Sequence, residues 1–294
     1  MPRRSGQRGG RAAAAYLDAP SHAWSVARRL VPTYGGALIR VRRSSDNAEA
    51  DIGQAGELLD EAALATHLGA DSGYLVTVYD QGVDTAADLT QTTTTAQYRI
   101  ANAGVIERLG AGLRPAGTIY QASQGMRFTL GGAVAIDTAT FYHVGLGSSA
   151  VSAGARLFSV LSGAAADGSA SGNIAAVLMN SASGSNDKLR SIRSGTTTVS
   201  VTVPPAAVNA YCVTADGSWL TIEAGLTAAH AETTYTSTST GNFTFDRGGW
   251  SVTGAATFSS HIGCFAGESA YWLTGLAPSA RAALMAGARQ FWGF

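Results

Sequence analysis

Hydrophobic and polar residues alternate in short segments along this chain, and each such segment predicts a β-strand. In residues 37–41, Ile39 and Val41 take one face and Arg40 the other, which is the pattern of a half-buried strand. Residues 199–203 alternate valine with serine and threonine in the same way. Other strand-like segments are residues 74–79, 126–130, 140–144, 156–161 and 174–179. Strand signals at such short intervals are typical of an all-β sandwich.

Turn residues separate these segments without dividing the chain into domains. Residues 211–213 and 219–222 flank Asp216-Gly217, a dipeptide suited to a tight hairpin turn. Segments rich in glycine, serine and threonine, at 163–172 and 233–241, predict exposed loops. Because strand signals lie on both sides of each loop, we expect one sandwich domain.

A few segments predict helices that decorate the sandwich. Ser21 could cap a short helix over residues 22–30, and Asp60 could cap another over residues 61–68. Near the end of the chain, Pro278 occupies a plausible first helical position before an alanine-rich sequence. That last helix would carry the aromatic pair Phe291 and Trp292 against the sandwich.

The 294 residues carry no net charge, but arginine is concentrated near the N-terminus. Residues 1–43 contain nine arginines and a single acid, Asp18. This separation predicts a basic arm, residues 1–20, joined to one domain, residues 21–294. The arm could contact nucleic acid or an acidic partner surface. A solvated arm without a partner is an equal alternative.

Cysteine, histidine and apolar segments add few sites. Cys212 and Cys264 lie in strand-like contexts, and they predict reduced core thiols rather than a disulfide framework. The five histidines are scattered, so no metal or other cofactor is predicted. No segment has the features of a secretion signal or the roughly 20 apolar residues of a membrane span. We therefore expect synthesis in a cytoplasm and no membrane insertion.

Three stretches resemble known carbohydrate-active domains. Residues 27–30 and 34–48, which join a helix end, an alternating strand and a polar turn, resemble the start of the catalytic domain of family 54 α-L-arabinofuranosidases. Residues 74–81, ending Val-Tyr-Asp-Gln, resemble a strand and turn of that family. Residues 268–292 resemble the last strand and helix of concanavalin-A-like domains. The resemblance implies a mainly β, concanavalin-A-like (jelly-roll) sandwich with a few short helices and a C-terminal helix.

The resemblance also bears on catalysis. Retaining glycoside hydrolysis uses two carboxyl groups about 5–5.5 Å apart, one as nucleophile and one as acid/base. Where the family has its nucleophilic Glu, the best counterpart in this chain is Ala175. Where the family's Asp follows an Ile-Gly-Gly run, this chain has Ile262, Gly263 and Cys264, and no Asp follows. The expectation is therefore a protein without catalytic residues.

The same N-terminal block also resembles structural proteins of phages and gene-transfer particles. Together with the missing carboxylates, it predicts a virion-associated head spike or tail fibre that binds host polysaccharide without cutting it. The arm would attach to other virion proteins, and we expect a homo-oligomer. A purely structural particle protein and, less favoured, a glycoside hydrolase are the alternatives.

Sugar rings pack on aromatic side chains, and sugar hydroxyls need polar partners nearby. The candidate carbohydrate-binding residues are Trp250, Asp246, Arg247, Tyr235, Asn186 and Asp187. A core position for Trp250 is an equal alternative, and for Trp272 a core position is favoured.

Overall fold

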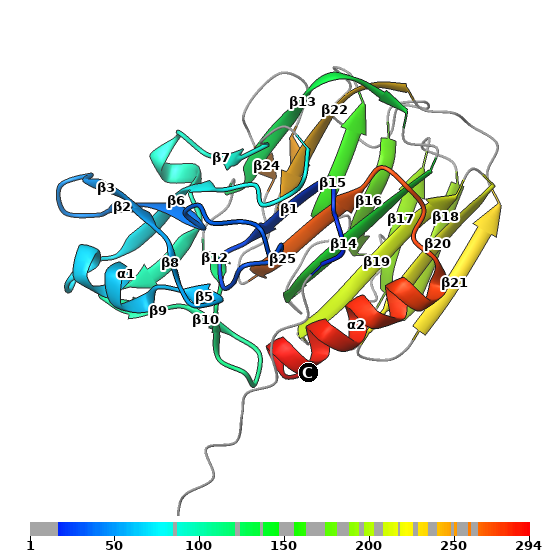
Figure 1. Cartoon of the computed structure of the whole chain (residues 1–294). Helices are drawn as coiled ribbons and strands as arrows, with labels where there is room; N and C mark the ends of the chain where they lie inside the picture. The colour runs from blue at the N-terminus through cyan, green and yellow to red at the C-terminus, as the bar shows by residue number, and fades with distance from the viewer. Residues whose placement is uncertain are drawn as a thin grey trace, which may run out of the picture.

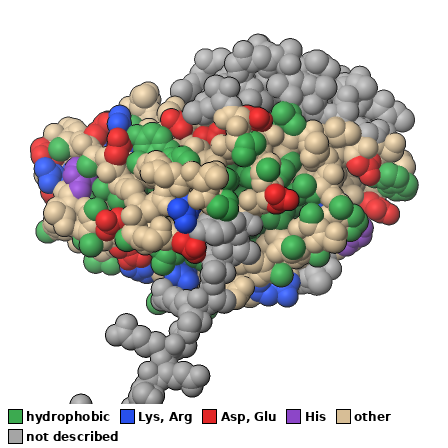
Figure 2. Space-filling view, viewed as in Figure 1, with side chains coloured by type: hydrophobic (Ala, Val, Ile, Leu, Met, Phe, Trp, Pro, Cys, Tyr) green, Lys and Arg blue, Asp and Glu red, His purple; other side chains and the backbone are tan. Residues whose placement is uncertain are grey.

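Antiparallel strands form most of the computed structural model, and two helices pack against them (Figure 1). The structure describes residues 17–84, 87–120, 124–135, 138–146, 156–162, 174–180, 188–193, 197–202, 208–216, 218–225, 229–234, 240–247, 250–251, 258–259 and 264–294. Acidic and basic side chains are interspersed over the face seen in Figure 2, so the described part of that face carries no extended field of one sign.

One layer of the sandwich is built around the strand closest to the C-terminus. Its strands are β1 (His22–Ser25), β12 (Gly117–Ile119), β14 (Thr138–Leu146), β19 (Val208–Asp216), β20 (Trp219–Ala224), β21 (Ala229–Thr234) and β25 (Cys264–Trp272). Strands β1 and β12 pair with successive parts of one edge of β25, and β14 pairs with its other edge. The layer continues from β14 through β19 and β20 to β21.

The facing layer runs β3-β2-β6-β7-β13-β22-β15-β16-β17-β18. Its strands are β2 (Ile39–Arg43), β3 (Glu49–Ile52), β6 (Gly73–Val78), β7 (Leu89–Thr90), β13 (Met126–Ala135), β15 (Arg156–Ser162), β16 (Ile174–Asn180), β17 (Lys188–Arg193), β18 (Thr197–Thr202) and β22 (Thr240–Arg247). Strand β8 (Arg99–Asn102) pairs with both β6 and β12, and so connects the two layers.

Shorter elements complete the described structure. They are β4 (Gln54–Ala55), β5 (Leu58–Leu59), β9 (Val105–Ile106), β10 (Arg108–Leu109), β11 (Arg114–Pro115), β23 (Trp250–Ser251), β24 (Phe258–Ser259) and the 3-10 helix η1 (Thr94–Ala96).

The predicted strand alternation produces the core between the layers. Ile39, Val41, Phe141, Val213 and Tyr271 are buried together there. Val199 and Val201 belong to the same cluster, and they lie in β18, a strand that the alternating valines predict. A mainly β sandwich is therefore confirmed.

Two of the three predicted helices occur. Helix α1 (Glu61–Leu68) begins at Asp60, whose side chain accepts a hydrogen bond from the Ala63 amide at 2.9 Å. Helix α2 (Pro278–Trp292) lies along the outer face of the first layer (Figure 1). Phe291 and Trp292, the last two residues of α2, are buried against this layer in a second apolar cluster, which also contains Tyr142, Cys212 and Trp272. Among the described residues, no helix is long and apolar enough to cross a membrane.

The helix predicted over residues 22–30 is wrong, because this segment contains strand β1 instead. All four β1 residues pair with β25, and both of their faces are buried. Trp24 packs between the layers, whereas Ala23 packs in the cluster under α2. This pairing outweighs the local helix signal of Ser21. The boundary at residue 20 stays a prediction, since residues 1–16 lie outside the described part of the chain.

Candidate functional site

A row of mostly polar residues crosses the second layer on one face of the sheet. Successive register partners in this row are Asp51, Arg40, Thr77, Thr90, Arg127, Asp246 and Ser159, which come from β3, β2, β6, β7, β13, β22 and β15. The adjacent row Ile39, Val78 and Leu89 is buried in the core. Since neighbouring residues of a strand take opposite faces, Asp51, Arg40 and Thr90 lie on the face that turns away from the core.

At one end of the row, Asp51 is held as an ionised carboxylate. Arg40 donates from Nε to Oδ1 at 2.7 Å and from a terminal nitrogen to Oδ2 at 2.9 Å. The Tyr79 hydroxyl donates to the same Oδ1 at 2.6 Å. The Arg40 hydrogen bonds lower the pKa of Asp51, and they outweigh the partial burial that opposes this shift. Asp51 remains exposed, so a ligand could reach it.

The pKa of a second carboxyl group, that of Asp88, is shifted in the opposite direction. Asp88 is half-buried directly before β7, and burial raises the pKa of its carboxyl group. The Asp80 amide donates to Asp88 at 2.9 Å and opposes that rise, while the Asp80 charge adds to it. Asp88 is therefore the carboxyl group that holds its proton to higher pH.

Two tyrosines, Tyr34 and Tyr79, have pKa values that both carboxylates help to raise. Burial, followed by the charge of Asp88, raises the pKa of Tyr34 to about 12, and Asp51 contributes to the same rise. Burial and the Asp51 hydrogen bond raise the pKa of Tyr79 to about 12, and Asp88 contributes there. Both acids contribute to the raised pKa of each phenol, and Tyr79 contacts Asp51 directly; Asp51, Asp88, Tyr34 and Tyr79 are here called the two-aspartate cluster.

A buried support fixes the turn that presents Asp88. The Asp80 carboxylate accepts from His22 Nδ1 at 2.7 Å and from the amides of Ala23 at 2.8 Å and Gly82 at 2.9 Å. It also accepts from the Ala87 amide at 3.0 Å. Asp80 is fully engaged with the chain itself, and we assign it a structural role.

Two carboxyl groups whose pKa values are pushed apart are the arrangement that acid/base catalysis requires. Asp88 was not among the site residues predicted from the sequence. The available signal was the Val-Tyr-Asp-Gln turn, since Tyr79 and Asp80 both belong to the contacts around the two acids. Among the described residues, no group of three metal-ligating side chains occurs.

The residues predicted to bind carbohydrate are only partly placed. Asp246 takes the register position between Arg127 and Ser159 in the polar row, and Arg247 takes the next position, opposite Met126 of the core. Trp250 is in β23 and pairs with Ser259. Tyr235, Asn186 and Asp187 lie outside the described residues. Binding of sugar by these six residues stays a prediction.

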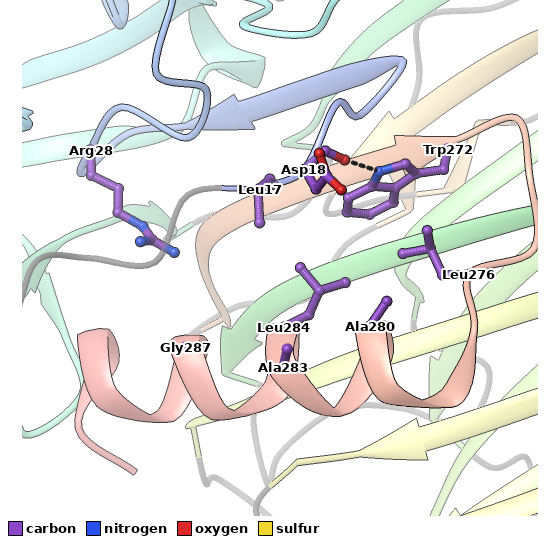
Figure 3. A pocket seen from close by; sticks show the side chains of 9 residues that line it. All are labelled: Leu17, Asp18, Arg28, Trp272, Leu276, Ala280, Ala283, Leu284 and Gly287. Atoms are coloured by element: carbon purple, nitrogen blue, oxygen red, sulfur yellow. Dashed lines mark hydrogen bonds between the residues drawn. The ribbon is translucent and has the colours of Figure 1, made fainter.

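A cavity of about 290 Å³ lies between α2 and the first described residues (Figure 3), and we assign it a structural role. Its lining is largely apolar, with Leu17, Leu276 and Leu284 among the side chains. The Trp272 indole donates to the Asp18 carbonyl at 2.8 Å at its edge. Trp272 is buried, which confirms its predicted core position.

Solved structures of similar fold are arabinofuranosidases. A mutant of a family 54 α-L-arabinofuranosidase soaked with 4-nitrophenyl α-L-arabinofuranoside matches with a TM-score of 0.67 at 15% identity, over 93% of this chain and 63% of that one. An arabinofuranosidase complexed with arabinofuranosyl-α-1,2-xylobiose matches with a TM-score of 0.65 at 14% identity and the same coverage. This chain thus spans less than two thirds of those proteins, and at such identity the likeness shows the fold. A comparison with curated proteins gave no match.

A match to a family model shows to which protein family the chain belongs. The model of the α-L-arabinofuranosidase B catalytic domain matches residues 15–245, well over half of the chain. The expectation of a non-catalytic, virion-associated adhesin is contradicted by this match, and so is the statement that the chain is not an enzyme. That expectation combined the resemblance to particle proteins with the absence of carboxyl groups at Ala175 and Cys264. The chain belongs to the family of the α-L-arabinofuranosidase B catalytic domain.

Proposed function

We propose that this chain is a glycoside hydrolase that releases α-L-arabinofuranosyl groups. The observation that carries the proposal is the family match over residues 15–245. The similar structures support the substrate class, since one was soaked with an aryl arabinofuranoside and another holds arabinofuranosyl-xylobiose.

The two-aspartate cluster supplies the groups for the reaction. Asp51, ionised by its contacts with Arg40 and Tyr79, is the proposed nucleophile. Asp88, whose pKa is raised by burial, is the proposed acid/base. Ala175 and Cys264 carry no carboxyl group, so the proposal takes two other acids, Asp51 and Asp88, because their pKa values are shifted in opposite directions.

In the proposed reaction, the Asp51 carboxylate attacks the anomeric carbon. The electron pair of the glycosidic bond passes to the leaving oxygen, which takes the proton of Asp88. Water then gives a proton to the Asp88 carboxylate and attacks the same carbon, which releases the sugar and restores ionised Asp51. Arg40 and Tyr79 keep Asp51 deprotonated before the attack.

Release of 4-nitrophenol from 4-nitrophenyl α-L-arabinofuranoside tests the proposal. Purified protein is expected to give turnover that rises in proportion to enzyme concentration. Matched aryl glycosides of pyranose sugars serve as controls for specificity. Absence of turnover on every arabinofuranoside tested, by protein that unfolds cooperatively, would overturn the proposal.

We also propose that the enzyme is carried by a phage-like particle. The resemblance of residues 27–48 to particle proteins and the arginine-rich residues 1–20 support attachment to other particle proteins, and a homo-oligomer that meets host polysaccharide. Co-sedimentation of the chain with purified particles tests this, and loss of co-sedimentation is expected when residues 1–16 are removed. A chain that stays wholly in the supernatant would contradict it.

A further inference from the structure

A polar groove lies on the opposite layer from the two-aspartate cluster, between the outer face of the first layer and the start of α2. It encloses about 460 Å³. Its floor comes from β19, β20 and β21, and its wall from the chain entering α2. The lining residues that the argument uses are Thr214, Asp216, Trp219, Thr221, Glu232 and Arg281.

Trp219 gives the groove an aromatic wall that faces water. Its side chain is 43% exposed, whereas Trp24, Trp272 and Trp292 are buried. Its backbone is fixed at the hairpin turn, because its amide donates to Asp216 Oδ1 at 2.7 Å. An exposed indole beside polar groups can stack on the C–H face of a sugar ring.

Polar groups surround this indole at hydrogen-bonding positions. Thr221 is the register partner of both Thr214 and Glu232, so hydroxyl, hydroxyl and carboxylate follow one another across three strands. The Glu232 side chain is about half exposed. Hydroxyls and carboxylates are partners that sugar hydroxyls can use as donors or acceptors.

The charges of the groove disfavour an acidic ligand. Arg281 donates to Glu223 at 2.8 Å and to the Leu276 carbonyl at 2.7 Å, so its donors are engaged within the protein. Asp216 and Glu232 add negative charge to the groove lining, and Arg281, the arginine in that lining, is already paired with Glu223. An anionic polymer would meet repulsion there, whereas a neutral one would not.

A second hollow, of about 310 Å³, lies further along α2, and Glu223, His230, Met285 and Arg289 are among its lining residues. The helix rises about 16 Å between Pro278 and Arg289, at 1.5 Å per residue. A ligand longer than a single sugar ring would fit this length.

We infer that the groove between β19–β21 and α2 is a binding site for a neutral polysaccharide chain, with Trp219 as its stacking platform. The inference rests on the proposed function, because it adds a second place where a polymeric arabinose-bearing substrate is held. Binding there is separate from bond cleavage, so small aryl substrates do not require it.

Affinity electrophoresis in gels containing soluble arabinoxylan tests the inference. The wild type is expected to be retarded, and Trp219→Ala is expected to weaken the apparent affinity at least tenfold. Glu232→Gln should weaken it to a smaller degree. Leu113→Ala removes another exposed large apolar side chain outside the groove and should leave retardation unchanged. Unchanged retardation of Trp219→Ala, or none in the wild type, would overturn the inference.

The same variants separate this inference from the proposed function. Release of 4-nitrophenol by Trp219→Ala should equal that of the wild type. A wild type that is retarded by arabinoxylan but releases no 4-nitrophenol would contradict the proposed function and leave the groove supported. A wild type that hydrolyses without retardation would contradict the groove alone. Acidic polygalacturonate in the gel should retard the wild type less than arabinoxylan, and the reverse order would count against a neutral ligand.

Discussion

Arg28 and Glu268, separated by 240 positions in the chain, form a paired ion contact that is closed to solvent. Arg28 donates from Nε and from a terminal nitrogen to the two carboxylate oxygens, each at 2.8 Å. The Tyr142 hydroxyl donates to Glu268 at 2.7 Å, and the Arg28 guanidinium lies 4.3 Å from the centre of the Phe291 ring. This contact joins the segment that follows β1 to β14, β25 and α2 at one point.

Removing one partner should destabilise the protein strongly. Glu268→Gln would leave the Arg28 charge buried without its counter-ion, and the expected loss in the free energy of unfolding is about 3–5 kcal/mol. Urea unfolding measures this loss. The double variant Arg28→Met, Glu268→Leu should recover much of the stability, because it removes both charges. A double variant as unstable as the single one would contradict this account.

The pH dependence of stability should report the same pair. Burial alone would raise the pKa of Glu268, but the Arg28 guanidinium outweighs burial and holds it below the ordinary range. A lowered folded-state pKa contributes stability at pH above the unfolded value, about 4.3 for Glu, and loses it as pH falls further. Unfolding midpoints should therefore decline below about pH 4 in the wild type. Glu268→Gln should show a shallower decline, and an equal slope would contradict the assignment.

Local signals were sufficient where an element depends on its own residues. The cap at Asp60 and the alternation of Ile39 and Val41 could be predicted from the sequence, because caps and strand faces are short-range properties. Strand β1 could not be predicted, because its pairing with β25 involves residues far along the chain. Asp88 was missed for a related reason, since its raised pKa arises from burial that only the folded chain creates.

Substitution of Asp88 should separate two steps of the proposed reaction. Asp88→Asn is expected to slow release of arabinose from arabinoxylan by about 100- to 10,000-fold, the usual contribution of an acid/base group. Loss should be smaller on 4-nitrophenyl α-L-arabinofuranoside, because that leaving group needs little protonation. Asp51→Asn should lose both activities. Rates on the two substrates give the comparison.

The pH profile adds a control for Asp88. The protonated carboxyl group is the active form, so wild-type turnover should fall as pH rises above a pKa that lies higher than that of an ordinary aspartate. That alkaline limb should vanish in Asp88→Asn. Asp84→Asn changes an exposed acid of the neighbouring loop and should behave as the wild type. An Asp88→Asn enzyme with wild-type rates on both substrates would remove Asp88 from the mechanism.

The cap of α1 should carry a measurable part of the stability. Asp60→Ala removes the acceptor for the Ala63 amide, and the expected cost is about 1 kcal/mol. Asp60→Asn keeps an acceptor at the same place and should cost clearly less. Denaturant midpoints of the three proteins provide the measurement, and equal midpoints would contradict a capping role.

Gly110 should resist substitution for two reasons at once. Its φ of +73° is a left-handed conformation, and a Cβ there would lie 2.0 Å from the Trp292 carbonyl oxygen at the end of α2. Gly110→Ala is expected to cost about 2 kcal/mol or more. Gly56→Ala, at φ +71° with open space around it, isolates the backbone part and should cost less. Thermal unfolding of both variants distinguishes strain from collision.

The position of β25 also sets an order of events during synthesis. Strand β25 lies between β1 and β14, and β1 has no other partner among the described strands, so β1 stays unpaired until the distant β25 has been translated. Contacts of such long sequence separation form slowly, and the unpaired edges are exposed to other chains. Chaperone demand and the yield of folded protein should therefore depend on how quickly β25 and α2 leave the ribosome.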